Sequence, residues 1–174
     1  YVAKNFGYPV FNADYEVSKL YKKDKKIFKK LKKKLPKYIS SFPINKNEIT
    51  KAILSNKVNL QKIISIVHLE IRKLLKLFLI KNRNKKIIIL DIPLLLENKI
   101  NNKNDILVFV ESKKDEIEKR LKKRLNFNRK LINKFKKIQF SSSYKKKKSN
   151  FIIKNNFKKK SLNKSIKKIL NEIL

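Results

Sequence analysis

The sequence predicts an α/β fold with a parallel sheet, and two observations support this prediction. Short apolar segments of strand length alternate along the 174 residues with longer segments of helical periodicity, which is the order expected when helices connect parallel strands. One of the short segments, Lys86–Asp91, contains four consecutive apolar residues. Such a run is typical of a strand that is buried on both faces, as the strands of parallel sheets are.

The first predicted strand is short and follows the end of a helix. Residues 1–6 are expected to be a helix tail, which Gly7-Tyr8-Pro9 ends because proline cannot continue a helix. The next two residues, Val10-Phe11, predict a strand. Asn12 and Asp14 would therefore lie at its carboxyl end, the edge at which open α/β sheets bind their ligands.

Three helices are predicted next. A lysine-rich helix at 16–35 precedes a polar loop at 36–47, and a short helix at 47–54 ends at the Ser-Asn-Lys break 55–57. A long helix at 59–80 carries a core-facing stripe with helical spacing. The stripe consists of Ile63, Val67, Ile71, Leu74 and Phe78.

The second half of the chain is predicted to hold three strands. The strand at 86–91 should end near Asp91, because Pro93 has no N–H group for a ladder hydrogen bond. Two further strands are predicted at 106–110 and 151–153. The other predicted features are helices at 113–124, 129–139 and 162–174, a turn at 126–128, and a solvated face or mobile loop at the lysine run 145–148.

Composition narrows the classes of protein that the chain can belong to. The formal net charge of +35 would ordinarily suggest a nucleic-acid partner. Lys, Asn and Ile are abundant together, however, and A/T-rich codons encode all three, so we attribute most of the charge to genome composition and expect no specific nucleic acid. The absence of Cys and the single His exclude disulfides, thiol catalysis and multi-histidine zinc sites. The apolar runs are too short to span a membrane, and a cytoplasmic monomer is expected.

The segment Asp91-Ile-Pro-Leu-Leu-Leu-Glu97 resembles the Asp-x-Pro-Leu-Leu-x-Glu signature of dephospho-CoA kinases, the last enzymes of coenzyme A synthesis. The resemblance runs from residue 1 to about residue 170. Further motifs occur in the family's order: Tyr8–Asp14, a strand ending in Ala-Asp; His68–Arg72, similar to His-Pro-x-Ile-Arg; Arg120 and Arg124 with Gln139, similar to the lid and the segment after it; and Phe151–Asn155, similar to the last strand and its Asn.

The resemblance implies a fold and a reaction. The fold would be the three-layer P-loop nucleotide kinase fold, with a parallel sheet, a helical insertion that binds dephospho-CoA and a helical lid. The reaction would transfer the γ-phosphoryl group of ATP, with Mg²⁺, to the ribose 3′-hydroxyl of dephospho-CoA. In this fold, the core would comprise 1–14, 86–111 and 150–174, the insertion would comprise 15–85, and the lid would comprise 112–149.

One part of that fold has no counterpart in the chain. A phosphate-binding loop of the type G-x-x-x-x-G-K-[ST] needs glycines, and the only Gly is Gly7. Family members carry this loop at their amino terminus, just before a helix that begins much like residues 2–6, and the chain has no initiator Met. We therefore expect a fragment that starts after the loop. It would also lack the first, central strand, which lies between the strands at 86–91 and 105–110.

Asp14 and Asp91 are the candidate catalytic and metal-binding residues. Asp14 resembles the family's Asp beside the acceptor hydroxyl, which implies a general base; the alternative is a cap of the following helix. Asp91 ends a strand, where a carboxylate can hold Mg²⁺ beside a nucleotide phosphate, directly or through water. The alternative for Asp91 is a buried strand followed by an ordinary turn.

The resemblance also implies a binding surface for dephospho-CoA. His68 and Arg72 lie one turn apart on the predicted helix 59–80, where Arg suits a phosphate and His can hydrogen-bond the acceptor. Leu69 replaces the family's Pro between them. The alternative is an ordinary His and an exposed Arg on a long helix. Four further residues of this surface are expected just after Asp91: Pro93, Leu94, Leu95 and Glu97.

On the nucleotide side, the resemblance implies that Arg120 and Arg124 close over ATP from one face of the lid helix. The alternative is a solvated basic face, although arginines are few in this lysine-rich chain. Asn155 is expected on the adenine side. Ser149-Asn150 replaces the family's Ala-Asp before the last strand.

Two other functions stay open at this point. One is a basic, non-catalytic nucleic-acid-binding protein, which would bind any polyanion with a steep salt dependence. The aromatic residues are not interleaved with basic residues, as a stacking platform for bases would require. The other is a different nucleotide or nucleoside kinase, which a comparison of acceptor substrates would identify.

We expect the 174-residue chain by itself to be inactive as a kinase. Without the loop lysine and the loop amides, the β- and γ-phosphates of ATP have no cradle. Without the central strand, unpaired backbone groups should leave the chain poorly stable. Robust ATP-dependent turnover of dephospho-CoA by the purified chain would contradict this expectation.

Overall fold

The computed structural model describes residues 5–124 and 127–174. The predicted helix tail at 1–6 and the predicted turn at 126–128 therefore lie partly outside the described residues, although Asn5 and Phe6 are helical. The chain divides into two compact units, residues 1–93 and 94–174, each of which is described separately below. None of the helices in the described ranges combines the length and the apolar composition that crossing a membrane requires.

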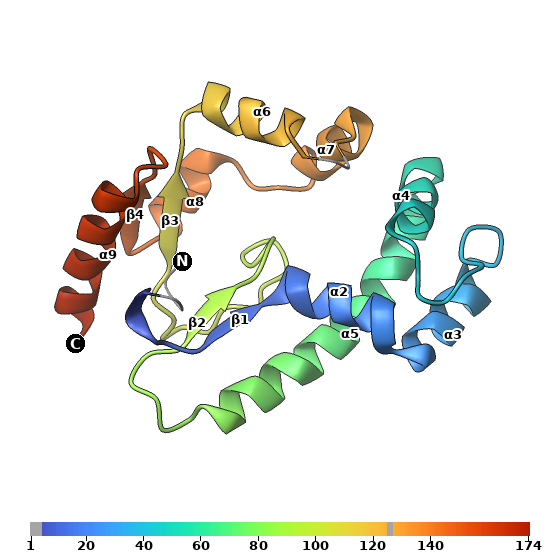
Figure 1. Cartoon of the computed structure of the whole chain (residues 1–174), viewed down its shortest axis with the longest axis horizontal. Coiled ribbons are helices and arrows are strands. Elements are labelled where there is room, and N and C mark those ends of the chain that lie inside the picture. The colour runs from blue at the N-terminus through green and yellow to red at the C-terminus, as the bar shows by residue number, and fades with distance from the viewer. Residues whose placement is uncertain (1–4, 125–126) are drawn as a thin grey trace. The chain divides into compact units, whose positions relative to one another are not determined.

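Two short parallel strands organise the first unit. Strand β1 (Val10–Asn12) pairs with β2 (Ile89–Asp91), as the two adjacent arrows in Figure 1 show. The register places Asn12 opposite Asp91. Strand β2 ends at Asp91, which confirms the predicted end of this strand. Its predicted start was three residues too early, because pairing with the three-residue β1 begins only at Ile89.

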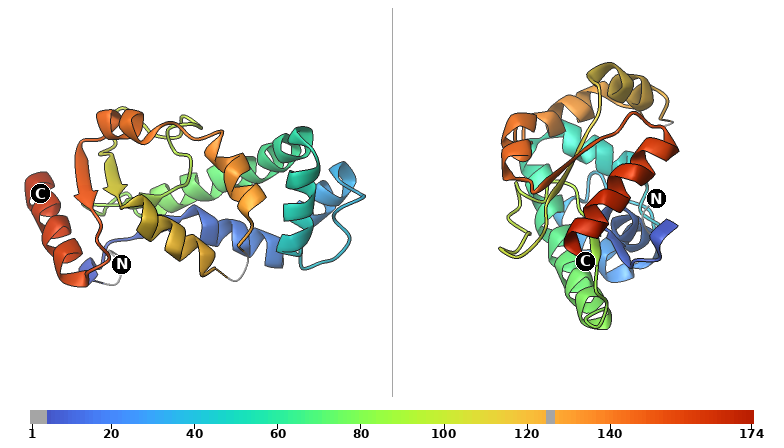
Figure 2. Two further views of the ribbon diagram at one scale, coloured as in Figure 1. Left: turned by 90° about the horizontal axis from the view of Figure 1, so that it is seen from above. Right: turned by 90° about the vertical axis from the view of Figure 1, so that its left-hand side faces the viewer.

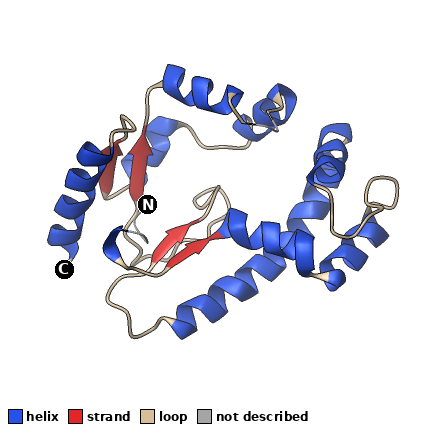
Figure 3. Ribbon diagram, in the orientation of Figure 1, coloured by secondary structure: helices blue, strands red, loops and turns tan. Residues whose placement is uncertain are grey.

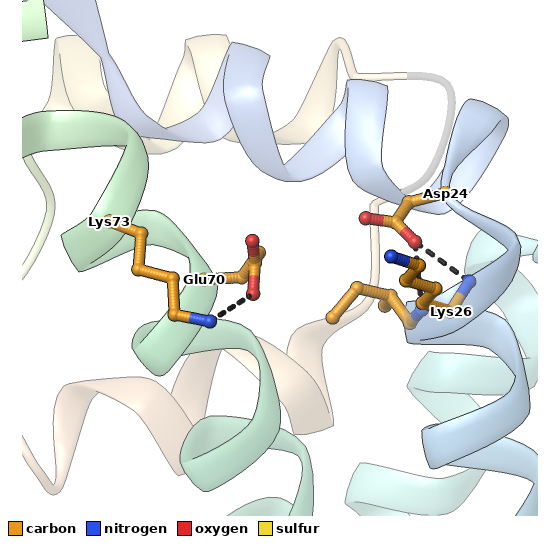
Figure 4. Close-up of polar contacts among 5 residues, drawn as sticks. Asp24, Lys26, Glu70 and Lys73 are labelled. Carbon is orange, nitrogen blue, oxygen red and sulfur yellow. Dashed lines mark hydrogen bonds and ion pairs between the residues drawn. The ribbon is translucent and has the colours of Figure 1, made fainter. Parts of the chain in front are cut away.

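Four helices complete this unit: α2 (Ala13–Lys23), α3 (Lys25–Lys34), α4 (Lys46–Ser55) and α5 (Lys57–Lys81). The single helix predicted at 16–35 is wrong, because Asp24 divides it in two. Asp24 has an extended backbone, and its Oδ1 accepts hydrogen bonds from the N–H groups of Lys26 (2.8 Å) and Ile27 (2.9 Å) (Figure 4). The carboxylate thus caps α3 immediately after α2 ends.

Helix α5 packs against α2, α3 and α4 and forms the centre of the core. Three positions of its predicted stripe, Ile63, Val67 and Ile71, are buried. The stripe then continues through Leu75, and Leu74 is only half-buried, so the predicted position was one residue off. Among the described residues, the buried apolar side chains all belong to the first unit except Ile153 and Ile166.

The second unit also contains a parallel pair, β3 (Val108–Glu111) with β4 (Phe151–Lys154), whose strands run side by side in Figure 2. Helix α9 packs against β4. The helices of this unit are α6 (Lys114–Lys122), α7 (Arg129–Lys136), α8 (Ser142–Lys148) and α9 (Lys159–Ile173).

Helix α8 lies where a mobile lysine-rich loop was one of the predicted possibilities, and that possibility is wrong. Ser141 begins the helix, because its Oγ accepts a hydrogen bond from the N–H of Tyr144 at 3.2 Å. Lys145 and Lys146 form ion pairs with Glu97 and Glu111 of the same unit. The lysines are therefore held by carboxylates that lie 35 or more positions earlier in the chain, and the local composition gave no sign of these partners.

The described residues thus form two two-stranded parallel sheets, drawn as red arrows in Figure 3. Parallel pairing of the strands is confirmed. The predicted single sheet needs a further strand between β2 and β3, and none of the residues in the described ranges supplies it. That central strand remains a prediction.

We expect Asp24→Ala to destabilise the first unit by about 1 kcal/mol, the usual effect of losing an N-cap. The N–H groups of Lys26 and Ile27 would lose their acceptor. Urea unfolding followed by circular dichroism measures the change. Asp24→Asn keeps a side-chain acceptor and serves as the matched control, so equal destabilisation by both substitutions would mean that the cap contributes nothing.

Candidate active site

The carboxyl ends of β1 and β2 are joined by one side chain, that of Asn12. Its Nδ2 donates a hydrogen bond to Asp91 Oδ2 at 2.7 Å, and its Oδ1 accepts one from the N–H of Tyr15 at 2.8 Å. The first bond fixes the end of β2 against the end of β1, and the second caps α2. A strand end, a helix start and a carboxylate therefore meet at one edge of the β1–β2 pair.

Asp14 lies at this same edge, in the first turn of α2. Its side chain is exposed. The alternative that Asp14 caps α2 is wrong, because Asn12 is the capping residue. Asp14 therefore does not cap the helix, and its carboxylate is accessible to a ligand.

Asp91 is exposed, and one of its oxygens is occupied by Asn12. The other oxygen, Oδ1, accepts no hydrogen bond within residues 5–124 and 127–174. Those residues contain no cluster of three or more His, Cys, Asp or Glu that could hold a metal ion. A single accessible carboxylate oxygen fits Mg²⁺ all the same, since Mg²⁺ is commonly held by one or two carboxylates together with substrate phosphates and water.

His68 and Arg72 lie one turn apart on α5. His68 is half-buried, and burial lowers its pKa from 6.5; the positive charge of Arg72 lowers it further. The imidazole is therefore neutral at pH 7, with one nitrogen able to donate a hydrogen bond and the other able to accept one.

Arg72 itself is exposed and forms no ion pair with any residue that the structure describes. The nearest acidic position on α5, Glu70, is engaged elsewhere. Its carboxylate pairs with Lys73 at 3.4 Å on the same helix (Figure 4). The charge of Arg72 thus remains available for an anionic ligand.

Pro93 is exposed at the end of the first unit, and the second unit begins with a tight turn at Leu94 and Leu95. Leu94 has a φ of 56°, which is a left-handed backbone conformation. This conformation is unfavourable for any residue that has a Cβ atom. Its carbonyl accepts hydrogen bonds from both the N–H (3.0 Å) and the Nδ2 (2.9 Å) of Asn98. These bonds hold the strained turn closed, and strain of this kind often accompanies functional loops.

Glu97 anchors the same turn to α8 and to the segment before it. Its Oε1 pairs with Lys145 Nζ at 2.8 Å and accepts a hydrogen bond from the N–H of Phe140 at 2.8 Å. Burial raises the pKa of Glu97, since its side chain is only 9% exposed. The hydrogen bonds from Lys145 and from the N–H groups of Glu97 and Phe140, with the charge of Lys145, outweigh burial, and the net pKa is lowered from 4.5.

Arg120 lies on α6, and its guanidinium carbon is 3.7 Å from the centroid of the Phe157 ring. The predicted shared helix face of Arg120 and Arg124 is wrong. Helix α6 ends at Lys122, and Arg124 follows it in a turn in which its N–H donates to the carbonyl of Leu121 at 3.1 Å. Both arginine side chains are exposed.

Asn155 directly follows β4. Its N–H donates to the carbonyl of Glu111 at 2.7 Å, and its Oδ1 accepts a hydrogen bond from the N–H of Phe157 at 2.9 Å. Phe157 is thus bonded to Asn155 and stacked on Arg120, which brings these two predicted residues into one neighbourhood. Asn150, which replaces the family's Asp, extends the strand pairing through its Oδ1, which accepts from the N–H of Leu107 at 2.8 Å.

Sequence reasoning placed Asn12 at the ligand-binding edge but did not predict its role as a cap and as the partner of Asp91, and it did not identify Phe157. For Asn12 a signal existed, because Asn is a preferred N-cap and a helix was predicted to start a few residues later. For Phe157 there was none, since both its backbone conformation and its contact with Arg120 depend on tertiary structure.

Comparisons with known proteins agree with this picture. The family model described as dephospho-CoA kinase matches residues 1–161. The dephospho-CoA kinase of Wolbachia pipientis wMel is 31% identical over 172 residues, which cover 98% of this chain and 88% of that protein. The enzyme of the same description from Rickettsia felis is 31% identical over 164 residues, covering 94% and 84%.

Two solved structures share the fold. The crystal structure of TT1252 from Thermus thermophilus matches with a TM-score of 0.75 at 21% identity and covers 98% of this chain and 87% of that one. Dephospho-CoA kinase from Campylobacter jejuni matches with a TM-score of 0.63 at 20% identity, covering 99% and 88%.

The ion pair of Glu97 should make the second unit sensitive to acid. Because the folded pKa is lowered, its contribution is fully present above the unfolded value of 4.5 and is lost as the pH falls through the folded pKa. Glu97→Gln should therefore reduce the free energy of unfolding by about 1 kcal/mol at pH 7 and by less below pH 4.5. Denaturation at both pH values measures this. Glu116→Gln, at an exposed pair, is the control, and a pH-independent effect of Glu97→Gln would contradict the prediction.

Proposed function

The chain belongs to the dephospho-CoA kinase family, and we propose how its residues carry out the family's reaction. The protein is a phosphotransferase of the final step of coenzyme A biosynthesis. In the proposed reaction, the γ-phosphoryl group of ATP passes to the ribose 3′-hydroxyl of dephospho-CoA. Family membership favours this activity over that of a non-catalytic nucleic-acid-binding protein or a kinase for another nucleoside or nucleotide.

One observation carries the proposed mechanism, namely the position of two carboxylates at one edge of paired strands. The in-register pairing of β1 with β2 and the Asn12–Asp91 hydrogen bond place Asp91 beside the start of α2, where Asp14 lies. Phosphoryl transfer depends mainly on alignment and charge neutralisation, so such an edge is a suitable place for it.

We assign Asp14 the role of general base. The carboxylate would orient the acceptor hydroxyl and take its proton late in the transfer. Its exposure and the presence of a separate capping residue, Asn12, support this assignment.

We assign Asp91 to Mg²⁺, either directly or through a water molecule. When bound, the ion would neutralise charge on the ATP phosphates. This assignment is supported by Asp91 Oδ1, which accepts no hydrogen bond from the residues that the structure describes, and Asn12 would hold the carboxylate in place from its other oxygen.

For dephospho-CoA we propose binding residues in two places, the helical insertion 15–85 and the segment after β2. Arg72 would bind a phosphate of the acceptor, and the neutral His68 would donate or accept a hydrogen bond. Pro93, Leu94 and Leu95 would provide apolar contacts. We also assign Glu97 to the segment after β2, and its bonds to Lys145 and Phe140 would hold that segment in shape.

For ATP we propose the lid at 112–149 and the end of β4. Arg120 and Arg124 would neutralise charge on the phosphates, and Asn155 would lie on the adenine side. The core would comprise 1–14, 86–111 and 150–174, and the protein would act as a monomer. The kinetic experiments below use the loop-extended chain, meaning this chain preceded by the strand and phosphate-binding loop of a family member, because a loop of that type cradles the β- and γ-phosphates of ATP.

Asp14→Asn in the loop-extended chain should lower kcat about 10²–10⁴-fold, the range typical of losing a positioned acid or base. The amide keeps the shape of the side chain but cannot take the hydroxyl proton. Coupled assays of ADP release at saturating dephospho-CoA measure this. Glu16→Gln, which changes a carboxylate in the same turn of α2, is the matched control. Near-normal turnover of Asp14→Asn would remove Asp14 from the chemistry.

Arg72→Ala and Arg124→Ala should have opposite effects. Arg72→Ala should weaken dephospho-CoA binding by about 1.5–3 kcal/mol, the contribution of a charge-assisted hydrogen bond, and should leave ATP binding nearly unchanged. Arg124→Ala should impair ATP binding and spare dephospho-CoA. The two variants are compared by titrating each ligand separately at two salt concentrations. Arg83 is exposed, so Arg83→Ala is the control for loss of general positive charge. If both variants lost both ligands equally, the division of the site would be wrong.

A further inference from the structure

Phe157 occupies a backbone conformation that its side chain disfavours. Its φ is 63°, within the left-handed region where a bulky residue is uncommon because its Cβ crowds the following carbonyl. Glycine would adopt this conformation without that cost. We therefore expect a contact of the aromatic ring to compensate for the backbone strain.

The turn that contains Phe157 is built by side chains. Asn155 Oδ1 accepts from the N–H of Phe157 at 2.9 Å, and Asn156 Oδ1 accepts from the N–H of Lys158 at 3.0 Å. Ser161 Oγ donates a further hydrogen bond to Asn156 Oδ1 at 2.5 Å. The turn between β4 and α9 is thus fixed at several points, and the direction of the ring is fixed with it.

The half-buried ring contacts Arg120 of α6. The guanidinium carbon lies 3.7 Å from the ring centroid, whereas the lysine–aromatic contacts among the described residues measure 4.5–6.0 Å. At 3.7 Å the guanidinium face rests on the ring face, because an N–H group pointing at the ring would hold the carbon further away. The N–H groups at the guanidinium edge then point away from the ring.

Those N–H groups are available to a ligand. Arg120 forms no ion pair with a carboxylate of the described residues, and its neighbour Glu116 pairs instead with Lys119 at 3.6 Å. Stacking uses the face of the guanidinium, whereas bidentate binding of a phosphate uses its edge, so the two contacts are compatible.

We propose that Phe157 is a positioning residue for the ATP site: its ring holds Arg120 with the guanidinium edge directed to the phosphate oxygens of ATP. This inference rests on the role that we assign to Arg120 in the proposed function. The ring removes rotamer freedom from a long exposed side chain before ATP arrives, so that less conformational entropy is lost on binding. Phe157 acts on ATP only through Arg120.

The test measures Mg·ATP and dephospho-CoA binding by calorimetry, and turnover, in the loop-extended chain. Phe157→Leu should weaken ATP binding about three- to tenfold, because the freed Arg120 side chain would then lose its rotamer freedom on binding ATP, and should leave dephospho-CoA binding unchanged. Phe157→Tyr keeps the stacking face and should bind ATP like the parent. In an Arg120→Ala background, Phe157→Leu should have no further effect. Phe127→Leu, at an exposed ring within the lid that does not stack on Arg120, is the control.

Thermal unfolding of the 174-residue variants separates positioning from stability. Phe157→Gly lacks both the ring and the strain, and Phe157→Leu lacks only the ring, so the Gly variant should melt at the higher temperature. Phe157→Gly and Phe157→Leu should nevertheless lose ATP affinity to the same extent. If Phe157 only stabilised the fold, the loss of ATP affinity would instead follow the melting temperature. Unchanged ATP binding in Phe157→Leu, or an undiminished effect in the Arg120→Ala background, would overturn the inference. A parent that binds ATP but does not phosphorylate dephospho-CoA would instead contradict the proposed function.

Discussion

The hydrogen bond from Asn12 to Asp91 is the interaction on which the geometry of the first unit depends. The strands β1 and β2 are each only three residues long, so their backbone pairing alone gives little resistance to a shift in register. A shift by one residue would turn Asp91 to the opposite face and would separate it from Asn12. Because the same Asn12 side chain also caps α2, the register of the strands and the start of the helix that carries Asp14 are set together.

The two units are stabilised by different kinds of interaction. The first buries most of the apolar side chains around α5, including Ile27 and Leu31 of the lysine-rich α3, so its charge is tolerated on the outer helix faces. The second buries few, and its segments are joined by side-chain hydrogen bonds and by the ion pairs of Lys145 and Lys146. Ionic contacts are weakened by salt and by acid, whereas apolar burial is much less affected.

The parts that the sequence predicted well are those that local pattern determines. Apolar runs located the four strands of the described residues, and Pro93 predicted that the second of them ends near Asp91. The failures have non-local or single-residue causes. Asp24 interrupts a lysine-rich pattern that continues on both sides, α8 depends on carboxylates far away in the chain, and the break before Arg124 replaces a continuous helix. The positions of the site carboxylates were predictable, whereas the contact of Arg120 with Phe157 was not, because it depends on a turn with a positive φ.

The bond between Glu97 and the N–H of Phe140 has a consequence for local dynamics. Phe140 lies outside the helices and strands, where backbone amides ordinarily exchange their hydrogen with solvent quickly. Its N–H is nevertheless held by a carboxylate that an ammonium group fixes from the other side. Exchange at this single amide therefore reports how often the link between the Leu94–Ile100 turn and the segment before α8 opens, independently of the unfolding of any helix or strand.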